Sequence, residues 1–222
     1  CRTEGCFVEI FGRLAWLLQR WPLWVLAGAF GLGVILWGGF NWAMVLTNTE
    51  SFCISCHEMR NNVFKEYKKT VHDSNGSGVR ATCPDCHVPK NWWPMTVRKV
   101  SSTKELFGAI RGSINTREKF LDKRWSLAET VWTNMQKTDS RECRNCHSKQ
   151  SMDLNKQARV ARERHLNARQ SGKTCIDCHK GIAHELPEAF IDAEHDRIEK
   201  EEIPCVDCHA GMWQPPTGEQ DY

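Results

Sequence analysis

Pairs of cysteines, each followed directly by a histidine, are the residues of this sequence with the clearest chemistry. The motif Cys-x-x-Cys-His occurs five times, at Cys53, Cys56 and His57; Cys83, Cys86 and His87; Cys143, Cys146 and His147; Cys175, Cys178 and His179; and Cys205, Cys208 and His209. In this spacing two thiols can bond the vinyl groups of one haem, and the adjacent imidazole falls under the iron as an axial ligand. The sequence therefore predicts five covalently bound c-type haems and a role in electron transfer.

Other uses of paired cysteines fit the sequence less well. Zinc ribbons and redox pairs also contain Cys-x-x-Cys, but neither requires a histidine directly after every pair. Histidine occupies only 9 of the 222 positions, so five such coincidences do not arise by chance. Five cysteine pairs also cannot combine two by two into zinc sites, and a disulfide across two residues is strained. Haem attachment is the interpretation that accounts for the histidines.

Histidines outside the motifs match the remaining need for axial ligands. A low-spin electron-transfer haem has two strong axial ligands, and a second imidazole is a common choice. Four histidines lie outside the motifs: His72, His165, His184 and His195. A lone histidine is often only a surface or core residue, but here we expect all four to be distal ligands. Four haems then have two histidine ligands each, and one haem needs a different second ligand.

An uncharged stretch between Trp21 and Thr49 predicts a membrane anchor. As a helix, residues 23–46 extend roughly 36 Å, which spans a hydrocarbon core of about 30 Å. A cleaved signal peptide is the alternative, but its apolar region is only about 7–15 residues long. We therefore predict an uncleaved transmembrane helix over residues 21–47.

Basic residues at one end of this segment predict its orientation. Arg13 and Arg20 precede the apolar stretch, so the positive-inside rule keeps residues 1–20 in the cytoplasm. Everything after Thr49 then lies outside, where bacteria attach haem c covalently. We expect a single-pass protein of the bacterial inner (cytoplasmic) membrane, embedded in membrane lipid, with a periplasmic haem domain.

The exported part is too short to build an ordinary apolar core around each cofactor, since it has only ~35 residues for each motif. No alternating strand pattern of useful length occurs. We predict a mainly α protein: a single N-terminal transmembrane helix plus a compact multihaem cytochrome c domain of short helices and loops wrapped on haems. The formal net charge is +3 and no basic stripe is present, so we expect no nucleic-acid partner.

Apolar periodicity predicts longer helices within the haem domain. Residues 95–137, between the second and third motifs, form two helices with a break near residues 112–116. A polar helix is expected over residues 153–170, and another helix over residues 187–203.

Five segments resemble the NapC/NirT family of membrane-anchored multihaem quinol dehydrogenases. They are NTESFCISCHEMRN (48–61), EYKKTVHDSNGSGVRATCPDCHVPK (66–90), STKELFG (102–108), ECRNCHSKQSMD (142–153) and GKTCIDCHKGIAHELP (172–187). The resemblance implies one membrane helix and a tetrahaem domain over residues 48–190. It also implies electron transfer from the membrane quinone pool, as menaquinol or ubiquinol, to a periplasmic reductase or cytochrome.

The resemblance further implies which axial ligands share an iron. It implies three histidine pairs: His72 with His179, His184 with His147, and His165 with His87. The first motif continues as Cys-x-x-Cys-His-x-Met, and one member of this family uses that methionine as an axial ligand of the first haem. Met59 is therefore the expected ligand beside the His57 position, and simple packing is the alternative.

The fifth motif departs from the family pattern, which typically has four haems. We assign residues 191–222 to a C-terminal extension that holds the fifth haem. His165 and His195 each stand ten residues before the first cysteine of the next motif, which indicates a duplicated helix-plus-haem unit. Such a histidine can serve a neighbouring haem, but His195 is the expected distal ligand of the fifth haem, with Met212 a weaker candidate.

A quinol site is implied near the first haem, which follows the membrane helix within a few residues. Glu105 matches the acidic position of the family site and is the candidate proton acceptor. Lys99 and Lys90 are candidates to bind a quinone oxygen or tune the site. A solvated helix face is the alternative for Glu105 and Lys99.

Two other function classes stay open. The chain can be an electron-conduit subunit of a larger membrane complex, fed by a protein donor rather than by quinol. The small residues Gly28, Gly31 and Gly33 suit such an assembly or a homo-oligomer. A catalytic multihaem reductase needs an open iron site, such as a haem in Cys-x-x-Cys-Lys, and the sequence contains no such motif.

Overall fold

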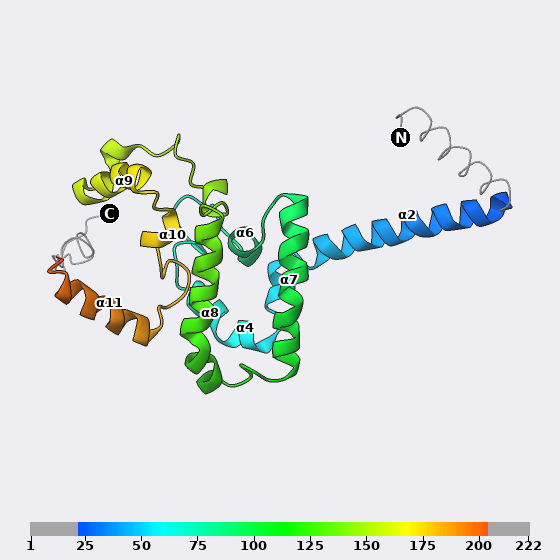
Figure 1. Cartoon of the computed structure of the whole chain (residues 1–222), viewed down its shortest axis with the longest axis horizontal. Helices are drawn as coiled ribbons and strands as arrows, with labels where there is room; N and C mark the ends of the chain where they lie inside the picture. The colour runs from blue at the N-terminus through cyan, green and yellow to red at the C-terminus, as the bar shows by residue number, and fades with distance from the viewer. Residues whose placement is uncertain (1–21, 204–222) are drawn as a thin grey trace, which may run out of the picture. The chain divides into compact units, whose positions relative to one another are not determined.

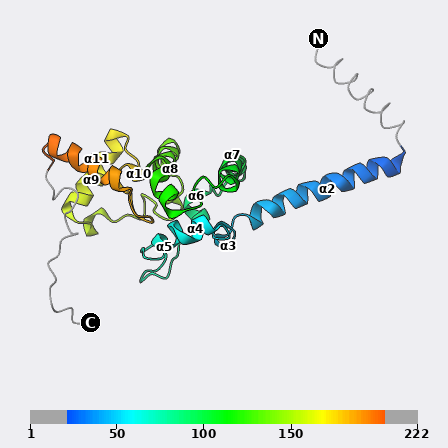
Figure 2. The same cartoon turned by 90° about the horizontal axis from the view of Figure 1, so that it is seen from below.

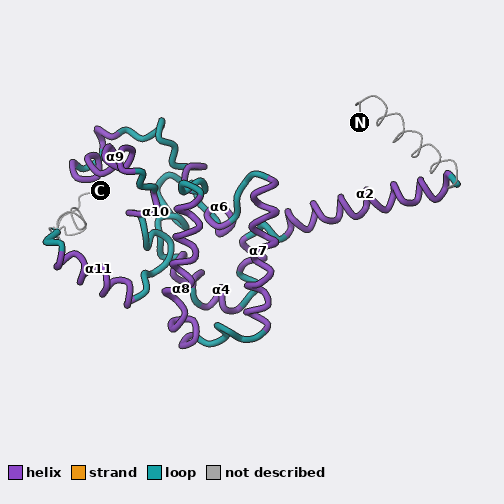
Figure 3. Tube along the Cα trace, in the orientation of Figure 1, coloured by secondary structure: helices purple, strands orange, loops and turns teal. Residues whose placement is uncertain are grey.

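A computed structural model describes residues 22–203, and every regular element within that range is helical (Figure 1, Figure 3). The elements are α2 (Leu23–Leu46), α3 (Glu50–Cys53), α4 (His57–Asn61), α5 (Val63–Tyr67), α6 (Cys83–His87), α7 (Trp92–Ile110), α8 (Arg117–Lys137), α9 (Arg159–Ser171), α10 (Cys175–Cys178) and α11 (Glu188–Lys200), with 3-10 turns η1 (Cys143–Asn145) and η2 (Leu154–Lys156). No strand occurs between residues 22 and 203, and the predicted mainly α fold is confirmed.

The chain forms two compact units that divide between Asn48 and Thr49. Within the first unit the described element is α2, a helix of 24 uncharged residues that is long and apolar enough to cross a membrane. Its large apolar side chains are exposed, as expected for a helix that faces lipid. Arg13 and Arg20, on which the predicted orientation depends, lie outside the described residues.

Helices α7 and α8 fill the long interval between the second and third motifs, and the break predicted between them is confirmed. Gly112 has a φ of 66°, a left-handed conformation that favours glycine. A Cβ atom there would lie 3.0 Å from the side-chain nitrogen of Asn115. The Thr116 hydroxyl then caps α8 by accepting a hydrogen bond from the Lys119 N–H. The two helices therefore run antiparallel (Figure 1, Figure 2).

The two helices expected near the C-terminus also form, with adjusted bounds. The segment predicted at residues 153–170 begins with the short turn η2, and α9 starts only at Arg159. Gly172 ends α9 with a φ of 67° and turns the chain directly into the fourth motif. Helix α11 runs from Glu188 to Lys200, so it crosses the domain boundary predicted between residues 190 and 191.

Few apolar side chains are buried in the described part of the chain. They are Met44, Tyr67, Phe120 and Ile176, whereas the buried polar and charged residues are Glu58, Asn62, Glu66, Asp73, Arg124, Ser140, Glu142 and Thr174. A small aromatic cluster ties α11 to α8, because the ring of Phe190 lies 4.8 Å from that of Trp132. A sparse apolar core fits a domain whose interior consists largely of cofactors.

Candidate functional site

The first four Cys-x-x-Cys-His motifs all lie on short helices, turns or their ends. In α6 the Asp85 carboxylate, inside the motif, accepts hydrogen bonds from the Thr82 N–H (2.9 Å) and hydroxyl (2.6 Å). In α10 the Asp177 carboxylate accepts one from the Thr174 N–H (2.7 Å). The sequence Thr-Cys-x-Asp-Cys-His thus caps its own helix. This cap holds the two thiols of the motif one helical turn apart.

Three of the four described motif histidines face a histidine from outside the motifs. The rings of His72 and His147 have centroids 6.3 Å apart. Those of His87 and His184 are 6.2 Å apart and those of His165 and His179 are 5.9 Å apart. A metal–imidazole bond of about 2.0 Å, with roughly 1.1 Å more to each ring centre, separates two trans imidazoles on one metal by roughly 6 Å. The three pairs therefore fit three irons with two histidine ligands each.

These pairs differ from those that the family resemblance implies. His72 faces His147 rather than His179, and His184 faces His87 rather than His147. The chain after the fourth motif returns to α5, because the Glu185 N–H donates to the Glu66 carboxylate (3.1 Å). That contact brings the preceding His184 to the second motif.

His165 likewise faces His179 rather than His87, the partner that the resemblance implies. The Gly172 turn folds α9 back onto the motif that directly follows it. In the described copy of the duplicated unit, the histidine ten residues upstream of the motif thus faces the histidine of that same motif.

Two distal histidines have Nδ1 fixed by a hydrogen-bond acceptor. Nδ1 of His72 lies 3.3 Å from the carbonyl oxygen of Ile182, and Nδ1 of His165 lies 2.6 Å from Oε1 of Gln157. A ring whose Nδ1–H donates to such an acceptor keeps Nε2 for a metal. Nδ1 of His184 is buried and has no hydrogen-bond partner. The donor set therefore suits haem iron.

Burial keeps the rings of His87 and His184 in the neutral form, which is the form that binds metal. Burial, together with smaller effects of the neighbouring His184 and Arg98, lowers the pKa of His87 to about 4. Burial also lowers the pKa of His184, which Glu66 and the carbonyl of Val63 partly offset. Both imidazoles are neutral at pH 7, as iron ligation requires.

Thiols of successive motifs are neighbours in space. The Cys83 thiol donates a hydrogen bond to Cys53 and lowers the pKa of Cys53 to about 7 against the effect of burial. Burial, together with a smaller effect of nearby Cys143, raises the pKa of Cys86 to about 11. Cys175 likewise adds to the effect of burial in raising the pKa of Cys143. The four described motifs thus follow one another as a continuous series of sites.

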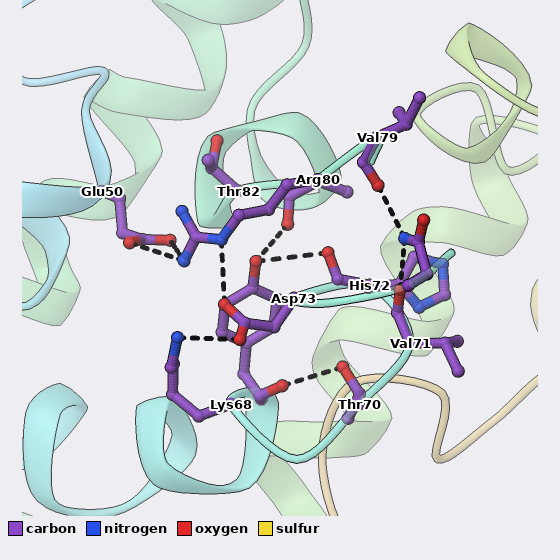
Figure 4. Close-up of polar contacts among 12 residues, drawn as sticks. Glu50, Lys68, Thr70, Val71, His72, Asp73, Val79, Arg80 and Thr82 are labelled. Carbon is purple, nitrogen blue, oxygen red and sulfur yellow. Dashed lines mark hydrogen bonds and ion pairs between the residues drawn. The ribbon is translucent and has the colours of Figure 1, made fainter. Parts of the chain in front are cut away.

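A charged network holds the loop that carries His72 (Figure 4). Arg80 donates to Asp73 (2.9 Å) and to both carboxylate oxygens of Glu50 (2.9 Å each). Lys68 forms a second ion pair with Asp73 at 2.8 Å. The hydroxyl of buried Tyr67 donates to the carbonyl of Ala81 (2.7 Å), and the Ala81 N–H donates to the His72 carbonyl. Because Glu50 lies in α3, this network also connects the loop to the first motif.

Ser140 holds the start of α10, which carries the fourth motif. It is fully buried, with a φ of 48°, and its hydroxyl oxygen accepts hydrogen bonds from the Thr174 hydroxyl (2.7 Å) and the Ile176 N–H (3.1 Å). Both donors belong to buried residues at the start of α10.

Replacing Ser140 by alanine should therefore lower the free energy of unfolding by about 1–3 kcal/mol for each donor left unpaired. Denaturant unfolding of the haem-loaded protein, followed by circular dichroism, measures this change. Ser171→Ala is the matched control, because its hydroxyl is exposed and bonds only within its own helix. Equal effects of the two substitutions would contradict the assigned role of Ser140.

The first motif has a different environment. His57 is exposed, and its Nε2 lies 3.4 Å from the carbonyl oxygen of Asn115. The ring contacts of the described residues give it no histidine partner, which agrees with the shortage of one histidine in the sequence. Met59 is half-buried two residues further on.

The three candidate quinol-site residues lie in different environments, and only Lys99 is shown to lie close to the first motif. Lys99 is half-buried and close enough to Cys53 to lower the pKa of that thiol, and burial lowers the pKa of Lys99 itself. Glu105 is exposed and forms an ion pair with Arg98 at 3.0 Å. Lys90 is exposed in the turn before α7.

Residues of the fifth site are only partly described. His195 lies exposed on α11, whereas Cys205, Cys208, His209 and Met212 lie outside the described residues.

Sequence reasoning missed the residues that hold the distal ligands. Ile182, Gln157, Arg80 and the pair formed by Glu66 and Arg124 were not candidates. Arg124 has a signal that could have found it, because it is a charged residue between the apolar positions of α8. The contact at Ile182 uses a main-chain carbonyl, which every residue has, so the residue type gives no signal of it.

Comparisons with known proteins identify the family. The family model described as "NapC/NirT cytochrome c family, N-terminal region" matches residues 18–189. The chain is 57% identical over 164 residues to the denitrification system component NirT of Stutzerimonas stutzeri, which covers 74% of this chain and 82% of that protein. It is 58% identical over 162 residues to the cytochrome c-type protein NapC of Paracoccus pantotrophus, covering 72% and 68% respectively.

A third relative is a putative tetraheme cytochrome-c type protein of Allochromatium vinosum, 46% identical over 175 residues, covering 79% of this chain and 95% of that protein. No solved structure matches the chain significantly. The family match ends before the fifth motif. With its repeated haem-attachment motifs, its facing histidines and one apolar helix, the chain belongs to the NapC/NirT family of membrane multihaem c-type cytochromes, which transfer electrons.

Proposed function

We propose that this protein is a membrane-anchored pentahaem cytochrome that oxidises membrane quinol and relays the electrons to a periplasmic redox partner. The observation that carries the relay is the series of neighbouring thiols from Cys53 to Cys175, together with the three facing histidine pairs. A bound c-type haem takes up and releases one electron at a time. A continuous series of such sites suits transfer over distance.

Haem attachment is assigned to the two thiols of each motif, and proximal ligation to the histidine that follows them. The proposed distal ligands are His184 for the second motif, His72 for the third and His165 for the fourth. By analogy with His165, which faces the motif directly after it, His195 is proposed to serve His209 of the fifth. Met59 is the proposed axial ligand at the first motif, where His57 has no described histidine partner.

We place quinol oxidation at the first motif, which follows the membrane helix after only a few residues. Lys99 is proposed to bind a quinone oxygen there, because it is half-buried beside Cys53. Glu105 is proposed to accept a proton from quinol, with Arg98, its ion-pair partner at 3.0 Å, holding the carboxylate in place. Lys90 is retained as a peripheral member of the site.

The proposed topology puts residues 1–20 in the cytoplasm and the haem domain in the periplasm, as the positions of Arg13 and Arg20 indicate. The proposed electron acceptor is a periplasmic reductase or cytochrome. Because the fifth motif lies outside the family match, the acceptor need not be the one that the named relatives serve.

Anaerobic mixing of the oxidised, detergent-solubilised protein with menaquinol or ubiquinol tests quinol oxidation, with the haem α-band as readout. We expect rapid reduction that Glu105→Gln slows by about a hundredfold, the lower end of what a positioned base contributes. Lys104→Gln, an exposed neighbour on α7, is the matched control and should react like the wild type.

Two results would contradict the proposal in different ways. A normal rate in Glu105→Gln removes the assigned proton acceptor. If neither quinol reduces the protein while dithionite reduces every haem, the chain is instead a conduit fed by a protein donor.

A further inference from the structure

A buried ion pair joins two helices beside the second motif. Nη1 and Nη2 of Arg124, on α8, donate to the two carboxylate oxygens of Glu66, on α5, at 2.8 and 2.6 Å. The two residues are 8% and 6% exposed. Burying two charges in an ion pair adds little net stability, so such pairs are often kept for the conformation that they specify.

The conformation specified here is that of the main chain at one residue, Glu185. Its N–H donates to the Glu66 carboxylate (3.1 Å), and its carbonyl oxygen accepts from both Nε and Nη2 of Arg124. Both main-chain polar groups of Glu185 are therefore bound by the pair, whereas its own carboxylate is exposed and meets Lys69 at 3.5 Å.

The residue directly before this peptide is His184, whose ring faces that of His87 at 6.2 Å with an interplanar angle of 27°. Nδ1 of His184 is buried with no partner at hydrogen-bond distance, although the Val63 carbonyl is near enough to raise the pKa of the ring, whereas Nδ1 of His72 and of His165 each meet an acceptor. The direction of the His184 ring thus depends more heavily on its main chain than that of the other two distal histidines.

We propose that Arg124 and Glu66 are positioning residues that hold the Glu185 peptide so that His184 reaches the iron carried by the second motif. This inference rests on the proposed ligation of haem by His87 and His184. The ion pair acts through the main chain and does not itself touch the ligand atom. It replaces the Nδ1 acceptor with which the other distal rings are fixed.

The test uses the full-length, haem-loaded protein and electron paramagnetic resonance (EPR) of its low-spin haems. His184→Ala identifies the signal of this haem by abolishing it. In Arg124→Lys and Glu66→Gln we expect that same signal to broaden or shift and part of it to become high-spin, with haem content unchanged. Added imidazole should return the high-spin fraction to low spin, because it supplies the ligand that His184 no longer places correctly.

Lys69→Met is the matched control, since Lys69 contacts the same residue through its exposed carboxylate and leaves the peptide clamped. It should preserve every signal. If either single variant does not accumulate, the double variant Glu66→Leu/Arg124→Met, which removes both charges together, is measured instead and should show the same site-specific change.

An unchanged His184 signal in well-folded variants would overturn the proposal, and so would an equal change in all signals. If His184→Ala abolishes no low-spin signal, the ligand assignment itself fails. That result would contradict the proposed haem ligation by His184. It is distinct from an unchanged signal in the Arg124 and Glu66 variants, which would contradict only their positioning role.

Discussion

Replacing His72 by methionine and, separately, replacing His147 by methionine is expected to abolish the same low-spin EPR signal. The reason is that their rings face each other at 6.3 Å, so each substitution changes one of two ligands on one iron. Exchange of imidazole for thioether should also raise the midpoint potential of that haem, by on the order of 0.1 V within the range that axial ligands span. Redox titration monitored by EPR measures both effects.

The pairing of His72 with His179 predicts a different result. The signal lost in the His72 variant would then be the one lost in His179→Met. His165→Met provides the control, because it should share its lost signal with His179→Met and with no other variant. Intact mass establishes that every variant keeps its full complement of haems.

Arg124→Met is expected to lower the free energy of unfolding by about 3–5 kcal/mol at neutral pH, because it leaves the buried Glu66 carboxylate without its partner. Arg197→Met on α11 is the control. Its pairs with Glu194 and Glu201 are largely exposed and screened by solvent, so its loss should leave the free energy of unfolding nearly unchanged.

The pH dependence of this effect follows from the pKa of Glu66. Burial raises that pKa, but the hydrogen bonds and charge of Arg124 lower it more, so the net value lies below the usual 4.5. The pair therefore stabilises the protein fully above pH 4.5, and this stability is lost as the pH falls through the lowered pKa. Without Arg124 the effect of burial, which raises the pKa, is opposed only by the Glu185 N–H and by His184, so Glu66 takes up its proton at a higher pH.

The stability gap between wild type and Arg124→Met should consequently narrow as the solution is acidified. Adding Glu66→Gln to Arg124→Met should restore much of the loss at pH 7, since no unpaired carboxylate then remains. Denaturant unfolding between pH 4 and 7 measures both comparisons. A gap independent of pH would show that the charge of Glu66 is not the cause.

Local features of this fold could be predicted because local residues produce them. Thr82 and Asp85 cap α6 within four residues, and Gly112 separates α7 from α8 in a conformation that favours glycine. Placement of the membrane helix needed only length and composition. In each case the physical cause lies within the segment itself, so the sequence contains the signal.

The partners of the distal histidines could not be predicted in the same way. His184 reaches the second motif because the peptide after it bonds to Glu66, far away in the chain. His72 is fixed partly by a main-chain carbonyl, that of Ile182, which any residue would supply. Such contacts depend on how the loops return, and residue spacing carries little information about that.

The chain intervals spanned by two of the histidine pairs interleave, because His87 lies between His72 and His147 while its partner His184 lies beyond both. With iron bound across each pair, the two ligations act as crossed links in one chain. Closing the first link shortens the path along the linked chain between His87 and His184, which reduces the entropy lost on closing the second. Topology alone thus makes the two sites cooperative. Because His184 follows the fourth motif, the second site also cannot be completed before that motif has been synthesised.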